Sequence, residues 1–373
     1  LVAKQLYNLV KNVENMKLVL MSATPMYNDY KEIIFLTNIL NMNDKRSIIE
    51  INDVFDTDGK FIVNTDGDEI GKELLKRKLN GYVSYVKGDN PFTFPYRILP
   101  TDYDNEKSIL KMGYPINDIN NNRIENKINY FDLFINNIGS YQEKIYKYII
   151  HKTDFKNYDS YKYTLLQKPL EALNIVYPNT NLESILETEF DTINITADNL
   201  VGKNGLATIM SWDNKNPLKE IPMRGNYTFK DETMENIFLK DNIEKYSFKI
   251  NSILNSIENS EGPIIIYSQF IDGGLIPMAL ALESCGYKRY GDKSLFKTPP
   301  VEQMKNSNYI MITGDKSLTP DPKSDLKAAT DSNNINGDFV KVILISMAGS
   351  EGLDFKYIRQ IHILEPWYNI NRI

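Results

Sequence analysis

The sequence predicts an α/β protein in which parallel β-strands form sheets that helices cover on both faces. Two observations support this fold class. Short runs that are apolar at every or nearly every position, such as residues 264–267 and 340–345, are typical of strands buried on both faces. Stretches with apolar residues three and four apart separate these runs. Alternation of buried strand and amphipathic helix indicates a parallel sheet.

The first 50 residues show this alternation once. Apolar residues three and four apart predict a helix over residues 2–13, and residues 17–21 predict a short buried strand. A polar turn follows at residues 22–25, and a second apolar stripe predicts a helix over residues 33–40. Because the sequence starts with Leu1 rather than Met, we expect it to begin inside a domain.

The last third predicts a second unit of the same kind. Its apolar runs predict strands at residues 264–267, 309–312, 340–345 and 360–364. The first three of these strands end in small polar residues. In open α/β sheets, ligands bind at the carboxyl ends of the strands. Small polar turns there allow the backbone or phosphate of a ligand to come close.

The middle of the chain predicts a mixed, partly helical insertion. It alternates short apolar pieces with connectors rich in Asn and Asp, and "SYQEKIYKYIIH" and "YTLLQKPLEALNIVYP" predict helices. We therefore expect three parts: the end of a first α/β domain over residues 1–50, a connecting region over residues 51–240, and a second α/β domain over residues 241–373.

Composition excludes several classes of protein. One cysteine among 373 residues excludes an internal disulfide framework, and with only two histidines no zinc site is predicted. A net charge of -6 argues against a globally basic nucleic-acid coat but leaves room for a local basic groove. The sequence has no run that approaches a membrane span and no signal-peptide pattern, which favours an intracellular protein that does not contact membranes.

Five short motifs, in order, resemble those of superfamily 2 helicases. "SATP" at residues 22–25 resembles motif III, "IIIYSQF" at 264–270 motif IV, "ITG" at 312–314 the short motif after it, and "ISMAGSEGLDF" at 345–355 motif V; "IHILEPWYNINRI" is similar to the approach to motif VI. Each motif alone is weak, and the ordered set is far more specific.

A narrower resemblance covers nearly the whole chain. "FPYRILP", "QKPLEALNIVYP" and "GSEGLDFKYIRQIHILEPWYNINRI" are similar to helicase-like ATPases of nucleocytoplasmic large DNA viruses, relatives of the poxvirus early transcription factor small subunit and nucleoside triphosphatase I. This resemblance implies tandem RecA-like domains, with an NTP and Mg²⁺ in the cleft between them.

The resemblance also assigns site residues. It implies that motif III couples the NTP site to nucleic acid through Ser22, Ala23 and Thr24, and that Gly352 and Asp354 lie beside the nucleotide. The residues expected at the nucleic-acid backbone are Ser268, Gln269, Thr313, Gly314, Ser346, Gly349 and Ser350. The alternative for each motif is an ordinary strand-end turn or helix cap. Glu351 departs from the family, because this position is often basic in helicases.

No complete catalytic set is found in the sequence. A helicase NTPase needs a phosphate-binding loop with Lys and Ser or Thr, and an acidic box that binds the metal. The nearest stretch, "GYKRYGDKS" at residues 286–294, places Asp292 before the lysine and has the wrong spacing. By resemblance, the loop and the acidic box lie upstream of Leu1, and the arginines of motif VI lie beyond Ile373. We therefore expect the main ATP and Mg²⁺ ligands outside this sequence and no NTP hydrolysis by these residues alone.

The function that follows is that of an NTP-dependent helicase or translocase in viral transcription or genome processing. We expect sequence-tolerant binding of nucleic acid, with DNA favoured over RNA, contacts with viral RNA polymerase or transcription factors, and a location in the virion or host cytoplasm. The alternative is a catalytically silent RecA-like subunit of a viral transcription complex. Trp367 and Tyr368 are expected to pack rather than stack on bases, and His362 to lie in a buried strand.

Overall fold

The structure is a computed structural model that describes residues 2–22, 25–26, 29–85, 98–118, 121–125, 131–153, 163–213, 225–291, 294–302, 308–347 and 353–366. The chain divides into two compact units. The smaller unit contains Leu1–Arg97 with Trp367–Ile373, and the larger contains Ile98–Pro366. This division does not coincide with the expected boundaries near residues 50 and 240, which concern the domains of a helicase and stay predictions.

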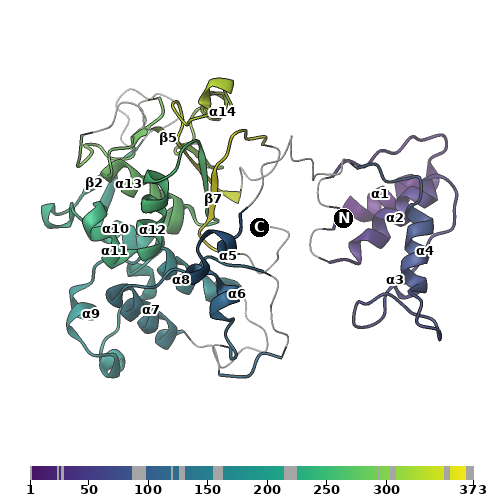
Figure 1. Ribbon diagram of the computed structural model, residues 1–373, viewed down its shortest axis with the longest axis horizontal. Helices are drawn as coiled ribbons and strands as arrows, with labels where there is room; N and C mark the ends of the chain where they lie inside the picture. Colours follow the sequence, from purple (N-terminus) through teal and green to yellow (C-terminus); the bar gives the residue numbers. More distant parts are fainter. Residues whose placement is uncertain are drawn as a thin grey trace. The chain divides into compact units, whose positions relative to one another are not determined.

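The described regular elements of the smaller unit are the helices α1 (Val2–Asn12), α2 (Glu32–Asn43), α3 (Ile51–Val54) and α4 (Ile70–Leu79) (Figure 1). Both helices predicted in the first 50 residues are therefore confirmed. The core joins Ile34 of α2 to Val54 and Phe55, and the ring of Phe55 stacks on that of Phe61 with centroids 5.2 Å apart. Residues just after position 50 thus share one core with α2.

The strand predicted at residues 17–21 does not form. The segment has no regular structure, and Val19 and Met21 are 78% and 93% exposed. A strand that is apolar on both faces needs neighbouring strands to bind its backbone N–H and C=O groups. No other described segment of the smaller unit forms a strand, so these apolar side chains lie at the surface.

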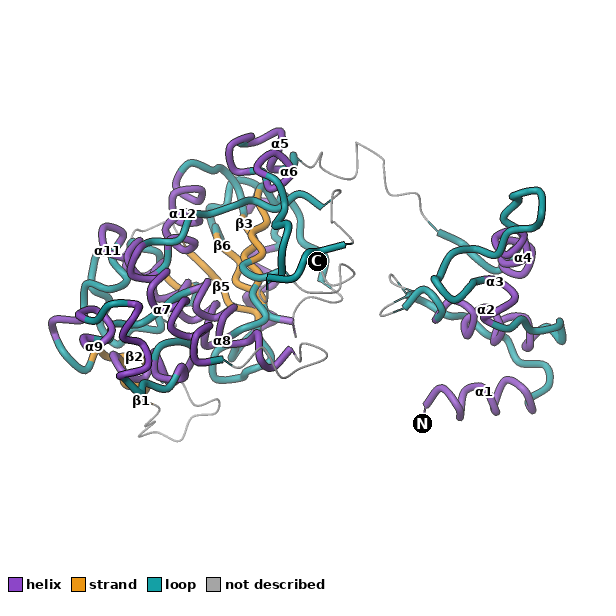
Figure 2. Tube along the Cα trace, turned by 90° about the horizontal axis from the view of Figure 1, so that it is seen from below, coloured by secondary structure: helices purple, strands orange, loops and turns teal. Residues whose placement is uncertain are grey.

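The larger unit is built on a five-stranded parallel sheet, as predicted for the last third of the chain. Its strands follow the order β4-β5-β6-β3-β7, and every pairing is parallel; Figure 2 shows β5, β6 and β3 in succession. The four predicted strands agree with the observed ones to within two residues at each end. The strands are β3 (Ile264–Tyr267), β4 (Lys288–Arg289), β5 (Asn308–Ile312), β6 (Val342–Ile345) and β7 (Gln360–Ile363).

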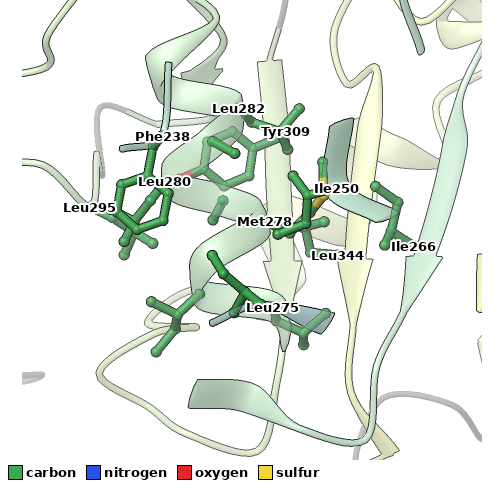
Figure 3. Packing of buried hydrophobic residues seen from close by; sticks show 14 of the residues in the cluster. Phe238, Ile250, Ile266, Leu275, Met278, Leu280, Leu282, Leu295, Tyr309 and Leu344 are labelled. Atoms are coloured by element: carbon green, nitrogen blue, oxygen red, sulfur yellow. The ribbon is translucent and has the colours of Figure 1, made fainter. Parts of the chain in front are cut away.

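One face of this sheet packs against α12 (Phe248–Glu258) and α13 (Ile276–Ser284). Figure 3 shows this core, in which Met278 of α13 lies among side chains of the sheet and of α12. Every residue of α13 is buried, because the helix is covered by the sheet on one side and by further segments on the other.

The opposite face is covered by α14 (Pro322–Ala329) and by the segment that leads into β7, through Leu353, Phe355 and Ile358. The alternation along β3 shows the two-sided burial. Ile264 and Ile266 belong to the first core, whereas Ile265 and Tyr267 pack against the second. The apolar strand pattern in the sequence therefore corresponds to a doubly covered sheet.

The predicted helices of the middle region also form, and they are not a separate layer. Helices α7 (Ser140–Lys152) and α8 (Tyr163–Asn174) pack on each other around Tyr148 and Ile149. Residues just after α8, such as Ile175 and Tyr177, are fully buried in the core of the sheet. The middle region thus completes the core of the larger unit.

The remaining described elements of the larger unit are short, and β1 pairs with β2 as an antiparallel hairpin. None of the helices in the described part of the chain is long and apolar enough to cross a membrane. The elements are α5 (Pro100–Tyr103), η1 (Asn105–Lys107), α6 (Ile109–Met112), α9 (Thr180–Ser184), η2 (Glu187–Thr192), η3 (Ala197–Asn199), α10 (Gly202–Ile209), β1 (Met210–Asp213), β2 (Asn226–Phe229), η4 (Glu232–Met234), α11 (Lys240–Tyr246), η5 (Ile271–Leu275) and η6 (Ser332–Asn334).

Candidate functional site at the carboxyl edge of the sheet

Four strands of the larger unit end in register. The last residues of β5, β6, β3 and β7 pair in one line across the sheet. The ladder continues by one residue: the N–H of Ser346 donates to the last carbonyl of β5 at 3.1 Å, and that of Ser268 to the last carbonyl of β6 at 3.2 Å. Neighbouring strands lie about 4.8 Å apart. The turns at this carboxyl edge therefore begin side by side, at Thr313, Ser346, Ser268 and Leu364.

The hydroxyl of Ser268 already has partners. Ser268 is fully buried, and its Oγ donates to Oε1 of Glu365 and accepts from the N–H of Phe270 at 3.1 Å. These contacts hold the turn after β3 in place. A phosphate that bound this hydroxyl would have to compete with Glu365, so the assignment of Ser268 to the nucleic-acid backbone stays a prediction.

Two other polar atoms at the edge have no hydrogen-bond partner among the described residues. They are Oγ of Ser346, a residue that is only 3% exposed, and the buried Nε2 of Gln269. More than nine in ten buried polar groups in proteins are hydrogen-bonded. Each of these two atoms is therefore available to a bound polar group.

The turn after β5 is rigid at Thr313 and open at Gly314. The N–H of Thr313 donates to Oγ1 of Thr319 at 2.9 Å, and the two threonine hydroxyls are 2.9 Å apart. Oγ1 of Thr319 in turn donates to the carbonyl of Met311 at 3.0 Å. Gly314 is exposed and has no side chain, so its backbone is open to a ligand.

The remaining predicted residues are placed only in part. Ser22 is exposed in the smaller unit, and Asp354 is exposed on the segment that leads into β7. Their assigned roles therefore stay predictions. The others lie outside the described residues: Ala23, Thr24, Gly349, Ser350, Gly352, Trp367 and Tyr368.

Within the stretch at 286–294, the described residues 286–291 form a helix end and an edge strand rather than the start of a phosphate-binding loop. Gly286 follows α13 with a φ of +89°, which is the left-handed conformation common just after helices. The edge strand β4 comes next, and Gly291 has a φ of +75°. In a phosphate-binding loop, by contrast, the glycine-rich turn leads directly into a helix.

Carboxylates are prominent at this edge. Asp272 lies in the turn after β3, and its pKa is raised by burial and further by the nearby Asp315, while Lys203 opposes the shift. A phosphate beside these carboxylates would be repelled by them, so it would need hydroxyl, amide and backbone donors as well as cations.

Three polar residues next to this edge were not predicted from the sequence as part of the site: Asn174, Lys249 and Glu365. Asn174 and Glu365 are at most 2% exposed, and the Lys249 ammonium lies against both Asn174 and the backbone of β7's exit. The one feature of the sequence that could have pointed to this cluster is Glu365, a carboxylate between an apolar strand and a proline. Its partners lie more than 90 residues away in the sequence, so no local pattern could identify them.

His362 lies in β7, as predicted. Its Nε2 is 2.9 Å from Oε1 of Gln360, and burial lowers the pKa of the imidazole to about 4. The ordinary pKa of a histidine, which the unfolded chain would show, is about 6.5. The neutral form is therefore favoured by folding. The contribution of His362 to stability is fully present above pH 6.5 and is lost as the pH falls toward 4.

We therefore expect His362→Gln to remove part of the acid sensitivity. Between pH 7 and pH 4.5, the wild type should lose about 2 kcal/mol more unfolding free energy than the variant. Urea denaturation at both pH values measures this difference. His151→Gln, at an exposed histidine of α7, is the control and should keep the wild-type loss. Equal losses in the wild type and His362→Gln would contradict the assignment.

The described residues of the smaller unit enclose a separate open cavity of about 720 Å³, and none of its lining residues belongs to the predicted site. It lies beside α4, whose last turn contains Lys76, Arg77 and Lys78. Lys76 is paired with Glu73 at 2.7 Å, which reduces the positive charge of this surface.

Comparison with known proteins places the chain among viral helicase-like proteins. No family model matches it. It is 23% identical over 98% of its length to the putative helicase 087L of Invertebrate iridescent virus 3, and 22% identical over 98% to the termination factor NPH-I homolog of African swine fever virus. It is 23% identical over 96% of its length to the putative ATP-dependent RNA helicase R563 of Acanthamoeba polyphaga mimivirus.

The chain spans half or less of each of these relatives: 29%, 48% and 49% of their respective lengths. The larger unit has the parallel sheet, flanked by helices, of a RecA-like domain. That the smaller unit is the end of a first such domain stays a prediction. Over nearly its whole length, the chain is related to superfamily 2 helicase-like proteins of nucleocytoplasmic large DNA viruses.

Proposed function

We propose that the chain is part of an NTP-dependent superfamily 2 helicase or translocase that contacts nucleic acid at the carboxyl edge of the sheet. The observation that carries this proposal is the buried Oγ of Ser346, which has no hydrogen-bond partner among the described residues, together with the buried Nε2 of Gln269, which likewise has none there. The short side chain of Ser346 can reach a phosphate oxygen but cannot enter a groove to read base edges, and the Gln269 amide can donate to the same backbone. Binding should therefore tolerate different sequences.

The NTP and Mg²⁺ would be held mainly by residues outside these 373. Among the described residues, no group of three or more His, Cys, Asp or Glu side chains could hold a metal ion. Asp354 is exposed, and a single carboxylate can accept hydrogen bonds from a nucleotide but cannot by itself hold a triphosphate and its metal. The greater length of the relatives leaves room for the missing parts.

A role in viral transcription is supported by the name of the African swine fever virus relative, which is a termination factor. The mimivirus relative is named an RNA helicase, so the type of nucleic acid differs among relatives. We propose DNA as the preferred ligand, with viral RNA polymerase or transcription factors as partners in the virion or host cytoplasm.

The test is NTP hydrolysis by the intact protein, measured with and without several unrelated DNA and RNA oligonucleotides at two salt concentrations. We expect stimulation by all sequences of one type, and binding that weakens as salt rises. Asp354→Ala should lower hydrolysis about tenfold and leave the melting temperature nearly unchanged, since the side chain is exposed.

Two results would contradict the proposal. Strong preference for one sequence would mean that bases are read, and hydrolysis absent under every condition would favour a catalytically silent subunit. If Asp354→Ala unfolded the protein at a lower temperature with unchanged kinetics, the residue would be a structural part of its loop.

A further inference from the structure

A buried polar cluster joins distant parts of the larger unit next to the carboxyl edge. At its centre is Glu365, which follows β7 and is 2% exposed. Its Oε1 accepts from Nδ2 of Asn174 at 2.7 Å and from the hydroxyl of Ser268, and its Oε2 accepts from the N–H of Gln269 at 3.3 Å. One carboxylate thus binds the end of α8 and both residues that begin the turn after β3.

Lys249 connects the first turn of α12 to the same cluster. Its Nζ donates to Oδ1 of Asn174 at 2.8 Å and to the carbonyl of Leu364 at 2.6 Å. Burial lowers the pKa of Lys249 to about 8, although the charge of Glu365 opposes this, and burial raises the pKa of Glu365. A charge pair in such surroundings is stable only while its hydrogen bonds keep good geometry.

The backbone of η5 closes the cluster. Nδ2 of Asn174 is also 3.3 Å from the carbonyl of Gly273, and a Cβ atom added at Gly274 would lie only 2.2 Å from Oγ of Ser268. The backbone at Gly274 thus packs directly against the cluster, and there is no room for a methyl group at this position. The position of the turn after β3 is fixed by contacts from the end of α8 and from the exit of β7, and Lys249 of α12 binds both of these segments.

We propose that Glu365 is a positioning residue, which sets the turn containing Gln269 and the exit of β7 in the geometry that couples nucleic-acid binding to NTP turnover. This inference rests on the proposed function. Both carboxylate oxygens of Glu365 already accept hydrogen bonds, so Glu365 acts through Ser268 and Gln269 rather than by touching nucleic acid itself. Through Asn174, the end of α8 contacts this cluster directly. A change in the middle region can therefore alter the position of the turn after β3.

The test compares Glu365→Gln with Glu283→Gln in the intact protein. Glu283 of α13 is a matched control, because it is also fully buried and accepts two backbone N–H groups, those of Leu295 at 2.7 Å and Phe296 at 2.9 Å. In each variant, the new amide replaces one acceptor oxygen with a donor. The two variants should therefore lose similar stability.

Hydrogen exchange gives the first readout, which does not depend on activity. Glu365→Gln should speed exchange of the Gln269 amide roughly tenfold, because that N–H loses its acceptor. Glu283→Gln should leave the Gln269 amide unchanged and speed exchange at Phe296 instead, because the remaining oxygen can still accept from Leu295 and Tyr309.

The second readout is stimulation of NTP hydrolysis by a DNA oligonucleotide. Glu365→Gln should lower the stimulated rate roughly tenfold to a hundredfold, with a smaller change in the unstimulated rate, and Glu283→Gln should keep the wild-type ratio of the two rates. Equal ratios in all three proteins, or equal losses in both variants, would show that Glu365 is only structural. If the wild type itself showed no stimulation, the proposed function would fail, while the exchange result would still decide whether Glu365 positions Gln269.

Discussion

Glu283→Ala is expected to lower the free energy of unfolding by about 3–5 kcal/mol. The carboxylate of Glu283 accepts from the hydroxyl of Tyr309 at 2.6 Å and from the backbone N–H groups of Leu295 and Phe296. Alanine would leave these three donors buried without an acceptor, and it would remove the carboxylate that lies near the buried Arg289.

Urea denaturation at pH 7 measures this loss. Glu235→Ala is the control, because Glu235 is exposed and its replacement should change stability by no more than about 0.5 kcal/mol. A loss below about 1 kcal/mol for Glu283→Ala would mean that water or a rearranged loop satisfies the three donors. The backbone at Leu295 and Phe296 would then be held less tightly against α13 than these hydrogen bonds indicate.

Ser346→Ala is expected to weaken the binding of nucleic acid without lowering the stability of the protein. The hydroxyl of Ser346 is buried and has no partner among the described residues, so its removal should leave stability unchanged or slightly higher. A hydrogen bond to a charged group such as phosphate is stronger than a neutral one. Affinity for nucleic acid should therefore fall roughly tenfold to a hundredfold, about equally for all sequences.

Ser284→Ala is the matched control for this prediction. Ser284 ends α13, is 4% exposed, and has a hydroxyl that likewise lacks a partner in the described part of the chain. The variant should resemble Ser346→Ala in stability and the wild type in affinity. If Ser346→Ala destabilised the protein by more than about 1 kcal/mol and bound normally, the hydroxyl would have a structural partner instead.

The sheet of the larger unit could be predicted from the sequence because burial on both faces leaves a local pattern. Strands β3, β5 and β6 are apolar at nearly every position, and the turn after each of them begins with a small polar residue. The same pattern misled at residues 17–21, since a strand forms only where neighbouring strands pair with it. The local sequence shows that a segment can form a buried strand, but it does not show whether neighbouring strands are present to pair with it.

The predicted strand ends form, whereas the role of the residues that follow them stays a prediction. The register of β5, β6 and β3 brings Thr313, Ser346 and Ser268 together, as strand-end motifs require. That Ser268 is occupied by Glu365 depends on a contact between residues 97 positions apart in the sequence. Such a contact leaves no periodic signal, so only the fold reveals it.

The most direct test of the central claim, that the carboxyl edge binds nucleic acid, is to crosslink a photoreactive oligonucleotide to the intact protein and map the attached peptides. We expect crosslinks in peptides that contain Gln269, Gly314 and Met347, which follow β3, β5 and β6, and we expect them to weaken in Ser346→Ala. Crosslinks confined to the basic end of α4, around Arg77, with none at the three strand ends, would contradict the account.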